Sequence, residues 1–239
     1  GPGGWSSFGR NPRPGEIRSI AYQQLAHGAD GTVWFRWRTC TAGREQYWHG
    51  LLGHDGRAGR RYREAARTAE EFHKLAPALA GTTTAAQAAV LYDYDSIWAL
   101  EIQPGYAGNR FVDAVRRYYA ALFRAGVGVD VVHPSADLSK YRLVVAADLY
   151  VLPDAVADAL VAYVRRGGVL LADCRTGVKD PTNLCHARTL PGRLSPALGV
   201  EIPEYEALAA DMEYPLVGAE DFAGAFTAVQ YVDWVVPKR

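Results

Sequence analysis

The sequence has few residues that could form covalent cross-links or closed metal sites. Its three cysteines, Cys40, Cys174 and Cys185, are far apart, and neither a CxxC nor an HxxxH spacing occurs. This scarcity excludes a disulfide framework and a four-ligand zinc site, so we expect no bound metal. Scattered free cysteines are typical of a reducing compartment, and we therefore expect a cytoplasmic protein.

The sequence also lacks an excess of charge and a long apolar run. Lys plus Arg and Asp plus Glu each number 26, so the formal net charge is zero. Nucleic-acid binding depends on a basic surface, so we expect no nucleic-acid partner. The arginines between 57 and 63 are followed by Glu64, which predicts a solvated helix face. A membrane span needs roughly 18 apolar residues in a row, and none occurs, so we expect no membrane partner.

Methionine is nearly absent, and the two ends of the chain are unusual. Met212 is the only methionine, and the chain starts with Gly1 and Pro2 inside a Gly- and Pro-rich stretch. The last strand-like segment stops abruptly near Arg239. We therefore expect a fragment of a longer protein, whose signal peptide, if it has one, cannot be read here.

Residues 1–80 have the pattern of an incomplete α/β barrel. Apolar residues at helical spacing predict a helix from about 16 to 27 and a second one from about 58 to 78. Between them, β-branched and aromatic residues predict a strand over 32–38, followed by a long polar loop. Helix, strand, loop and helix form the repeating unit of a barrel. We interpret 1–80 as the C-terminal portion of a (β/α)8 TIM barrel.

A linker rich in Pro, Gly and Thr at 77–84 separates this part from a second α/β domain at 85–239. Nearly continuous apolar runs predict four buried strands, and helical periodicity predicts two helices between them; the strands are at 88–92, 127–132, 143–147 and 168–173, and the helices at 109–125 and 154–166. Such strands indicate a parallel sheet covered on both faces, as in flavodoxin-like and class I amidotransferase-like domains. Beyond 175 we expect mostly loop, with a last strand at 228–236.

The loop after the first predicted strand carries the best candidates for a binding site. In a barrel this loop lies at the face where active sites are built. Glu45, Gln46 and His49 offer charge and hydrogen bonds, and the neighbouring Tyr47 and Trp48 offer flat apolar faces, a mixture that suits a sugar ring. Trp5, in a Gly- and Ser-rich stretch, is a further candidate. The alternative is an ordinary loop with a packed histidine and a tryptophan that only caps the barrel.

Several motifs, in order along the chain, resemble the β-galactosidases of glycoside hydrolase family 42. They cover most of the chain to about residue 207; the matching segments are 1–5 with 10–18, 24–31 with 35–38, 45–50, 54–56, 92–101 and 129–139. The resemblance implies retaining hydrolysis of terminal β-D-galactosides, with the second domain mediating trimerisation and a homotrimer as the assembly. The metal-binding cysteine cluster of some members lies upstream of this sequence.

The resemblance also implies roles for individual residues. Trp5 matches a tryptophan that lines the galactose site, and Glu45 and His49 match a glutamate and a histidine that hold sugar hydroxyls. Many members space these two residues three apart, whereas here they are four apart and Gln46 occupies the three-spacing. Whether Glu45 or Gln46 contacts the sugar is therefore open. Both catalytic glutamates are expected upstream of Gly1, so the chain alone is expected to be inactive.

The second domain offers no convincing chemistry of its own. Cys174 follows a strand, but no close glycine makes a nucleophile elbow, so an active thiol is not expected. Asp93 and Asp95 stand where a flavin or nucleotide domain needs a phosphate-binding loop, and their charges would repel phosphate, so no cofactor is expected. The alternative function is a non-catalytic flavodoxin-like assembly or ligand-binding module.

Overall fold

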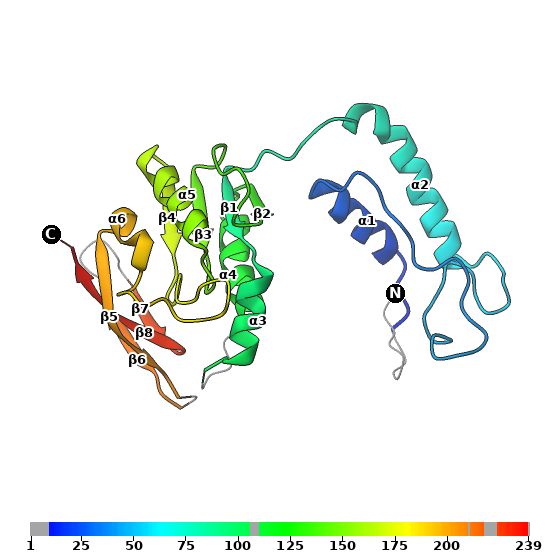
Figure 1. Cartoon of the computed structure of the whole chain (residues 1–239). Helices are drawn as coiled ribbons and strands as arrows, with labels where there is room; N and C mark the ends of the chain where they lie inside the picture. Colours follow the sequence, from blue (N-terminus) through cyan, green and yellow to red (C-terminus); the bar gives the residue numbers. More distant parts are fainter. Residues whose placement is uncertain (1–9, 106–109, 210, 218–223, 239) are drawn as a thin grey trace. The chain divides into compact units, whose positions relative to one another are not determined.

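The computed structural model describes residues 10–105, 110–209, 211–217 and 224–238. The chain divides into two compact units, Gly1–Thr84 and Ala85–Arg239. Each unit is described separately below (Figure 1).

The first unit is built on two packed helices, α1 (Glu16–Ala26) and α2 (Arg60–Leu79). Ala21 and Ala65 are buried between them, and Tyr22 meets Phe72 edge-on, with ring centroids 5.1 Å apart. Both helices agree with the prediction from apolar periodicity within about three residues. Pro77 lies inside α2 rather than in a linker, because proline in the last turn removes only one hydrogen bond of the helix.

The predicted strand over 32–38 does not form as a strand, which corrects that prediction. Only Arg38 makes a parallel bridge, to Leu52, and Leu51 N donates to Arg36 O at 2.8 Å. Val33 is 99% exposed, and Phe35 and Trp37 are also exposed. The residues are suitable for a strand, but a strand requires hydrogen-bonded neighbours, and within residues 10–84 the main-chain partner found for this segment is the short stretch 50–52.

The second unit is organised around a parallel sheet of four strands in the order β2-β1-β3-β4. Ala88 lies beside Val129 and Leu143, and Leu143 lies beside Val169. The elements are β1 (Ala88–Leu91), α3 (Tyr94–Ile102), α4 (Phe111–Arg124), β2 (Val129–Val132), β3 (Leu143–Ala146), α5 (Asp154–Arg165) and β4 (Val169–Ala172). The parallel α/β architecture predicted for this unit is confirmed.

Helices cover both faces of this sheet and form two apolar clusters (Figure 1). On one face Leu160 of α5 packs with Leu91 and Val144, and on the other Phe111 of α4 packs with Val90 and Val145. Strand β1 is therefore buried along its whole length, which explains its unbroken apolar sequence. The edge strand β4 is only partly covered and alternates between exposed and half-buried residues.

The C-terminal region contains more regular structure than the sequence predicts. It comprises a 3-10 turn at Gly192–Leu194, α6 (Ser195–Leu198), β5 (Val200–Ala207), β6 (Tyr214–Val217), β7 (Ala225–Ala228) and β8 (Tyr231–Pro237). Strand β5 pairs antiparallel with β8, and β6 with β7. The last strand expected at 228–236 corresponds to β8, whereas the region expected to be mostly loop also contains β5, β6 and β7. Pro203 in β5 resembles a strand breaker, but a register shift between Glu201 and Glu204 accommodates it.

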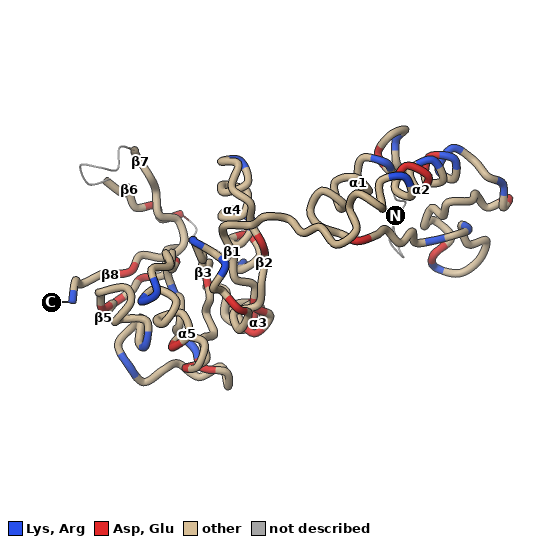
Figure 2. The backbone as a smooth tube through the Cα atoms, turned by 90° about the horizontal axis from the view of Figure 1, so that it is seen from above, with Lys and Arg blue, Asp and Glu red and all other residues tan. Residues whose placement is uncertain are grey.

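The charge distribution agrees with the balanced composition. Figure 2 shows acidic and basic residues interleaved along α2 rather than separated into one basic face. Among the described residues, no helix combines the length and the apolar character that crossing a bilayer requires.

Candidate functional site

The predicted contact residues Glu45, Gln46 and His49 lie together in one turn of the first unit, and all three are half-buried. The Glu45 carboxylate accepts a hydrogen bond from Arg36, with Nη1 2.8 Å from Oε2. This ion pair joins the turn to the segment where a strand was expected. The ion pair fixes the position of the Glu45 carboxylate, whose two oxygens only accept hydrogen bonds. Water still reaches this carboxylate, since the Glu45 side chain is 36% exposed.

Gln46 contributes to the turn through its main chain. Its carbonyl accepts a hydrogen bond from His54 Nε2 at 2.9 Å, which ties the turn to the loop that follows it. The carbonyl of Glu45 in turn accepts from the Trp48 amide at 3.0 Å and closes the turn. The contacts described for the two residues therefore differ. Glu45 is held through its side-chain carboxylate, and Gln46 is held through its main-chain carbonyl.

Aromatic side chains lie next to this polar turn. Trp48 meets Phe35 edge-on with ring centroids 5.4 Å apart, and Trp37 meets Tyr62 in the same manner at 5.8 Å. Phe35, Trp37 and Tyr47 all retain large exposed surfaces. Apolar rings beside fixed polar groups offer the two kinds of surface that a pyranose presents, its C–H face and its hydroxyls.

The end of the turn is locked by close backbone contact at Gly50. Gly50 N donates to Thr39 Oγ1 at 2.9 Å, and that hydroxyl donates to Leu52 O at 2.9 Å. A Cβ atom at Gly50 would lie 2.6 Å from both Arg38 C and Thr39 N. Only glycine allows the two segments to approach so closely, so the residue type at 50 helps to position the turn.

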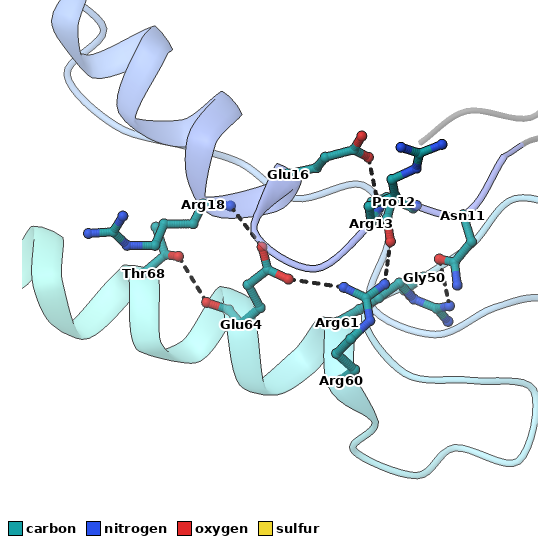
Figure 3. Close-up of polar contacts among 10 residues, drawn as sticks. All are labelled: Asn11, Pro12, Arg13, Glu16, Arg18, Gly50, Arg60, Arg61, Glu64 and Thr68. Carbon is teal, nitrogen blue, oxygen red and sulfur yellow. Dashed lines mark hydrogen bonds and ion pairs between the residues drawn. The ribbon is translucent and has the colours of Figure 1, made fainter.

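Two arginines at the start of α2, Arg60 and Arg61, hold Gly50 and the segment 11–12 in place (Figure 3). Arg61 donates from Nε to Gly50 O at 2.7 Å and from Nη1 to Asn11 Oδ1 at 3.1 Å. Arg60 donates to the carbonyl of Pro12 and pairs with Glu64 at 3.0 Å. Burial lowers the pKa of Arg61, and the charge of Arg60 adds to this effect.

These contacts correct the interpretation of the basic cluster as a solvated face. That interpretation holds for Arg63, which is exposed, but it is wrong for Arg60 and Arg61, which are half-buried. Charge pattern alone could not distinguish them, because all of these arginines belong to the same short basic run. Gly50 lies 11 residues before Arg61, whereas Asn11 and Pro12 lie 50 and 48 residues from their arginine partners.

Trp5, the fourth predicted contact residue, lies outside the described residues. Asn11 and Pro12 are described, and they contact the same turn of α2 as Gly50.

Two residues of the second unit that the sequence singled out, Cys174 and Asp93, have well-defined surroundings. Burial raises the pKa of the Cys174 thiol, and the neighbouring Asp173 raises it further, so the thiol stays protonated at neutral pH. Asp93 caps α3 by accepting from Ser96 N at 2.7 Å and from Ser96 Oγ at 2.6 Å. The helix end where a phosphate would bind is thus occupied by a carboxylate.

Helix α3 itself was not predicted. Its N-cap residue, Asp93, is the sequence signal that could have revealed it, because aspartate is favoured at the start of helices.

Comparison with known proteins identifies both units. The family model described as the β-galactosidase trimerisation domain matches residues 86–239, and the model described as β-galactosidase matches residues 1–75. The β-galactosidase BgaH of Haloferax lucentense is 38% identical over 98% of this chain, and Bga of Halorubrum lacusprofundi is 42% identical over 84%. This chain covers 34% and 29% of their respective lengths.

A solved structure supports the same conclusion. The β-galactosidase from Bacillus circulans sp. alkalophilus superimposes with a TM-score of 0.90 at 28% identity, covering 98% of this chain and 35% of that one. This likeness extends over both units and confirms the predicted fold class. The chain spans about a third of the length of the relatives that it matches. By these matches, the chain belongs to the β-galactosidases of glycoside hydrolase family 42.

Proposed function

We propose that this chain forms part of a retaining β-galactosidase, in which Glu45 and His49 hold hydroxyls of a terminal β-D-galactoside. The observation that carries the proposal is the Arg36–Glu45 ion pair beside the Phe35–Trp48 ring pair. An ionised carboxylate fixed by an arginine accepts hydrogen bonds from two adjacent hydroxyls, and such charge-assisted bonds are stronger than neutral ones. The rings provide a surface for the C–H face of the sugar.

Between Glu45 and Gln46, we assign the sugar contact to Glu45. Its carboxylate is held by Arg36, whereas the contact described for Gln46 passes through its carbonyl to His54. Trp5 is assigned to the same subsite on the basis of the family resemblance.

Residues 1–80 are proposed to be the C-terminal portion of the catalytic barrel, and residues 85–239 the trimerisation domain. Retaining hydrolysis needs two carboxyl groups roughly 5 Å apart, one as nucleophile and one as acid and base. The resemblance assigns neither role to a residue of this chain. The 239 residues alone are therefore expected not to hydrolyse 4-nitrophenyl β-D-galactopyranoside, and turnover by them would contradict the proposal.

A matched pair of variants tests the assignment of Glu45. In the complete polypeptide that carries this sequence, Glu45→Gln removes the charge and keeps the shape. Hydrogen bonds to charged groups contribute about 1.5–3 kcal/mol, so kcat/KM should fall about 10- to 100-fold. Gln46→Glu is the control and should change kcat/KM much less. If the Gln46 variant shows the larger effect, or if neither changes kcat/KM, the assignment is wrong.

We also propose that the second unit assembles the protein as a homotrimer. The name of the matching family model and the exposed apolar residues of its C-terminal strands, Leu216, Val217, Phe226 and Trp234, support this proposal. Size-exclusion chromatography with light scattering should give three times the mass of one polypeptide. A monomer at micromolar concentration would contradict it.

The three cysteines are free, which supports the proposal of a cytoplasmic location. Cell fractionation should recover the protein with three titratable thiols for this chain, and recovery outside the cytoplasm would contradict the proposal.

A further inference from the structure

A cavity of about 690 Å³ lies in the second unit, at the edge of the sheet where the strands begin. It is lined by Ala88, Leu143 and Val169, the first residues of β1, β3 and β4, and by the C-terminal parts of α4 and α5 with the loops that follow them. Its volume is in the range of pockets that hold small organic ligands. Nucleotide-binding α/β domains use the opposite edge, beyond the carboxyl ends of the strands, so this cavity is not the cofactor crevice of the fold.

Two buried tyrosines give the cavity a fixed aromatic wall. Tyr141 and Tyr163 both line it and are 5% and 3% exposed. The Tyr141 hydroxyl donates to Asp130 Oδ2 at 2.7 Å, and the Tyr163 hydroxyl donates to the Tyr141 carbonyl at 3.1 Å. The Tyr163 ring also lies against Gly168, where a Cβ atom would be 2.2 Å from Cζ. With both hydroxyls engaged, the rings offer an apolar surface that suits a flat ligand.

The charge on the walls has one sign. Arg142 and Arg166 line the cavity, and among the described lining residues none is acidic. Both arginines are exposed, and within the described ranges neither side chain has a hydrogen bond or an ion pair. The nearby Asp137 is engaged elsewhere, since it accepts from Ser139 N at 2.9 Å and from Ser139 Oγ at 3.0 Å. Two guanidinium groups at this cavity are therefore available to an anion.

The ends of the neighbouring helices limit the charge of that anion. Helices α4 and α5 end at Arg124 and Arg165, and residues just beyond both ends line the cavity. The carbonyl end of a helix is partly negative, which disfavours a doubly charged phosphate ester more than a singly charged carboxylate. Arg166 is the C-cap of α5, where a cation also interacts with the helix dipole, but Arg142 precedes β3 and has no such function.

From these walls we propose that the cavity is a second ligand site, which binds a small aromatic carboxylate through Arg142 and Arg166. A guanidinium binds a carboxylate through paired N–H donors, and such charge-assisted bonds are stronger than neutral ones. The ring of the ligand packs against the aromatic wall formed by Tyr141 and Tyr163 and against Val169, which is 59% exposed. This inference is independent of the galactoside subsite in the first unit.

A charged probe and its neutral counterpart test the chemistry of the site. Isothermal titration calorimetry is carried out on the complete polypeptide with 2-naphthoate and with 2-naphthalenemethanol, with galactose present to occupy the galactoside subsite. For a ligand of this size we expect one 2-naphthoate per polypeptide with a Kd of about 1 mM or lower. The neutral alcohol should bind at least about tenfold more weakly, because it cannot form charge-assisted bonds.

Matched arginine variants test which groups hold the carboxylate. Arg142→Gln and Arg166→Gln should each raise the Kd of 2-naphthoate about tenfold. Arg165→Gln is the control, because Arg165 is exposed and adjacent to Arg166 but does not line the cavity, and its Kd should equal that of the parent. The proposal is overturned if 2-naphthoate shows no saturable binding, if the alcohol binds equally well, or if the control variant loses as much affinity as the other two.

A second pair of variants locates the bound probe. Val169 lines the cavity on the edge strand β4, so Val169→Trp should fill part of it and abolish binding of 2-naphthoate. Val131→Trp is the control, because Val131 lies on the other edge strand, β2, is 48% exposed and does not line the cavity. It should leave the Kd unchanged. Undiminished binding to the Val169 variant would place the probe elsewhere and overturn the proposal.

Discussion

Replacing Gly50 by alanine tests whether close backbone packing positions the turn that carries Glu45 and His49. The added Cβ would lie 2.6 Å from Arg38 C and Thr39 N, and 3.0 Å from Arg36 O. All three are backbone atoms, so no side-chain rotation can relieve the contact. The segments 36–39 and 50–52 must therefore move apart.

The cost of this movement follows from the bonds that join the two segments. Leu51 N and Leu52 N each donate across the gap at 2.8 Å, and Gly50 N donates to Thr39 Oγ1 at 2.9 Å. Overpacking costs about 1–3 kcal/mol and each broken hydrogen bond about 0.5–1.5 kcal/mol, so a total of about 2–4 kcal/mol is expected. If about 1.4 kcal/mol of this cost is lost from the binding free energy of the sugar, KM rises about tenfold.

The assay compares KM for 4-nitrophenyl β-D-galactopyranoside and the thermal midpoint in the complete polypeptide. Gly31→Ala is the matched control, because a Cβ at Gly31 meets nothing within 4 Å and its φ is not positive. It should leave KM unchanged and keep or slightly raise the midpoint. A Gly50→Ala variant with the KM and midpoint of the parent would refute the argument that this contact holds the turn.

Three further predictions concern anchors of the fold. Arg61→Met removes the bonds to Gly50 and Asn11 and should raise KM more than Arg63→Met, which removes a bond to the nearby Ala58 O; equal KM values would contradict the anchoring role. Asp93→Ala removes the cap of α3 and should lower the free energy of unfolding in urea by about 0.5–2 kcal/mol, whereas the exposed Asp95→Ala should have little effect. The bonds from Arg18 and Tyr22 hold the pKa of Glu71 below 4.5, so their stabilisation is present above that pH and is lost as pH falls through the lowered pKa. When the midpoint of urea unfolding is measured against pH, the midpoint of Glu71→Gln should fall less steeply at acid pH than that of the parent. An equally steep fall would show that this contact does not contribute.

Local sequence patterns predicted much of the backbone. Helices α1, α2, α4 and α5 and strands β1 to β4 all occur where periodicity or apolar runs placed them. These elements depend on neighbouring residues or on simple burial, which the sequence displays directly. The expected strand over 32–38 did not form because a strand also needs neighbours distant in sequence, and among the described residues of this unit its main-chain contacts are with 50–52.

The candidate site was predicted in part. The residues of the turn could be named because a loop combining Glu45, Gln46 and His49 with aromatic residues has a recognisable composition. The anchoring function of Arg61 could not be predicted, because it depends on Gly50 and Asn11, the latter 50 residues away in sequence. Strand β5 could not be predicted for a similar reason. It contains Pro203, which usually interrupts a strand, and only the pairing of β5 with β8 shows that a bulge accommodates the proline.

The amino-acid pattern was enough to predict the class of fold, the order of the main elements and, through its motifs, the family. Which charged groups are buried, and what they contact, became visible only in the folded chain. Arg63 and Arg61 look alike in sequence, and the Arg175–Asp233 pair joins residues from opposite ends of the second unit's C-terminal half. The physical reason is that burial and pairing energies depend on segments distant in the chain, whereas helix and strand propensities depend mainly on adjacent residues.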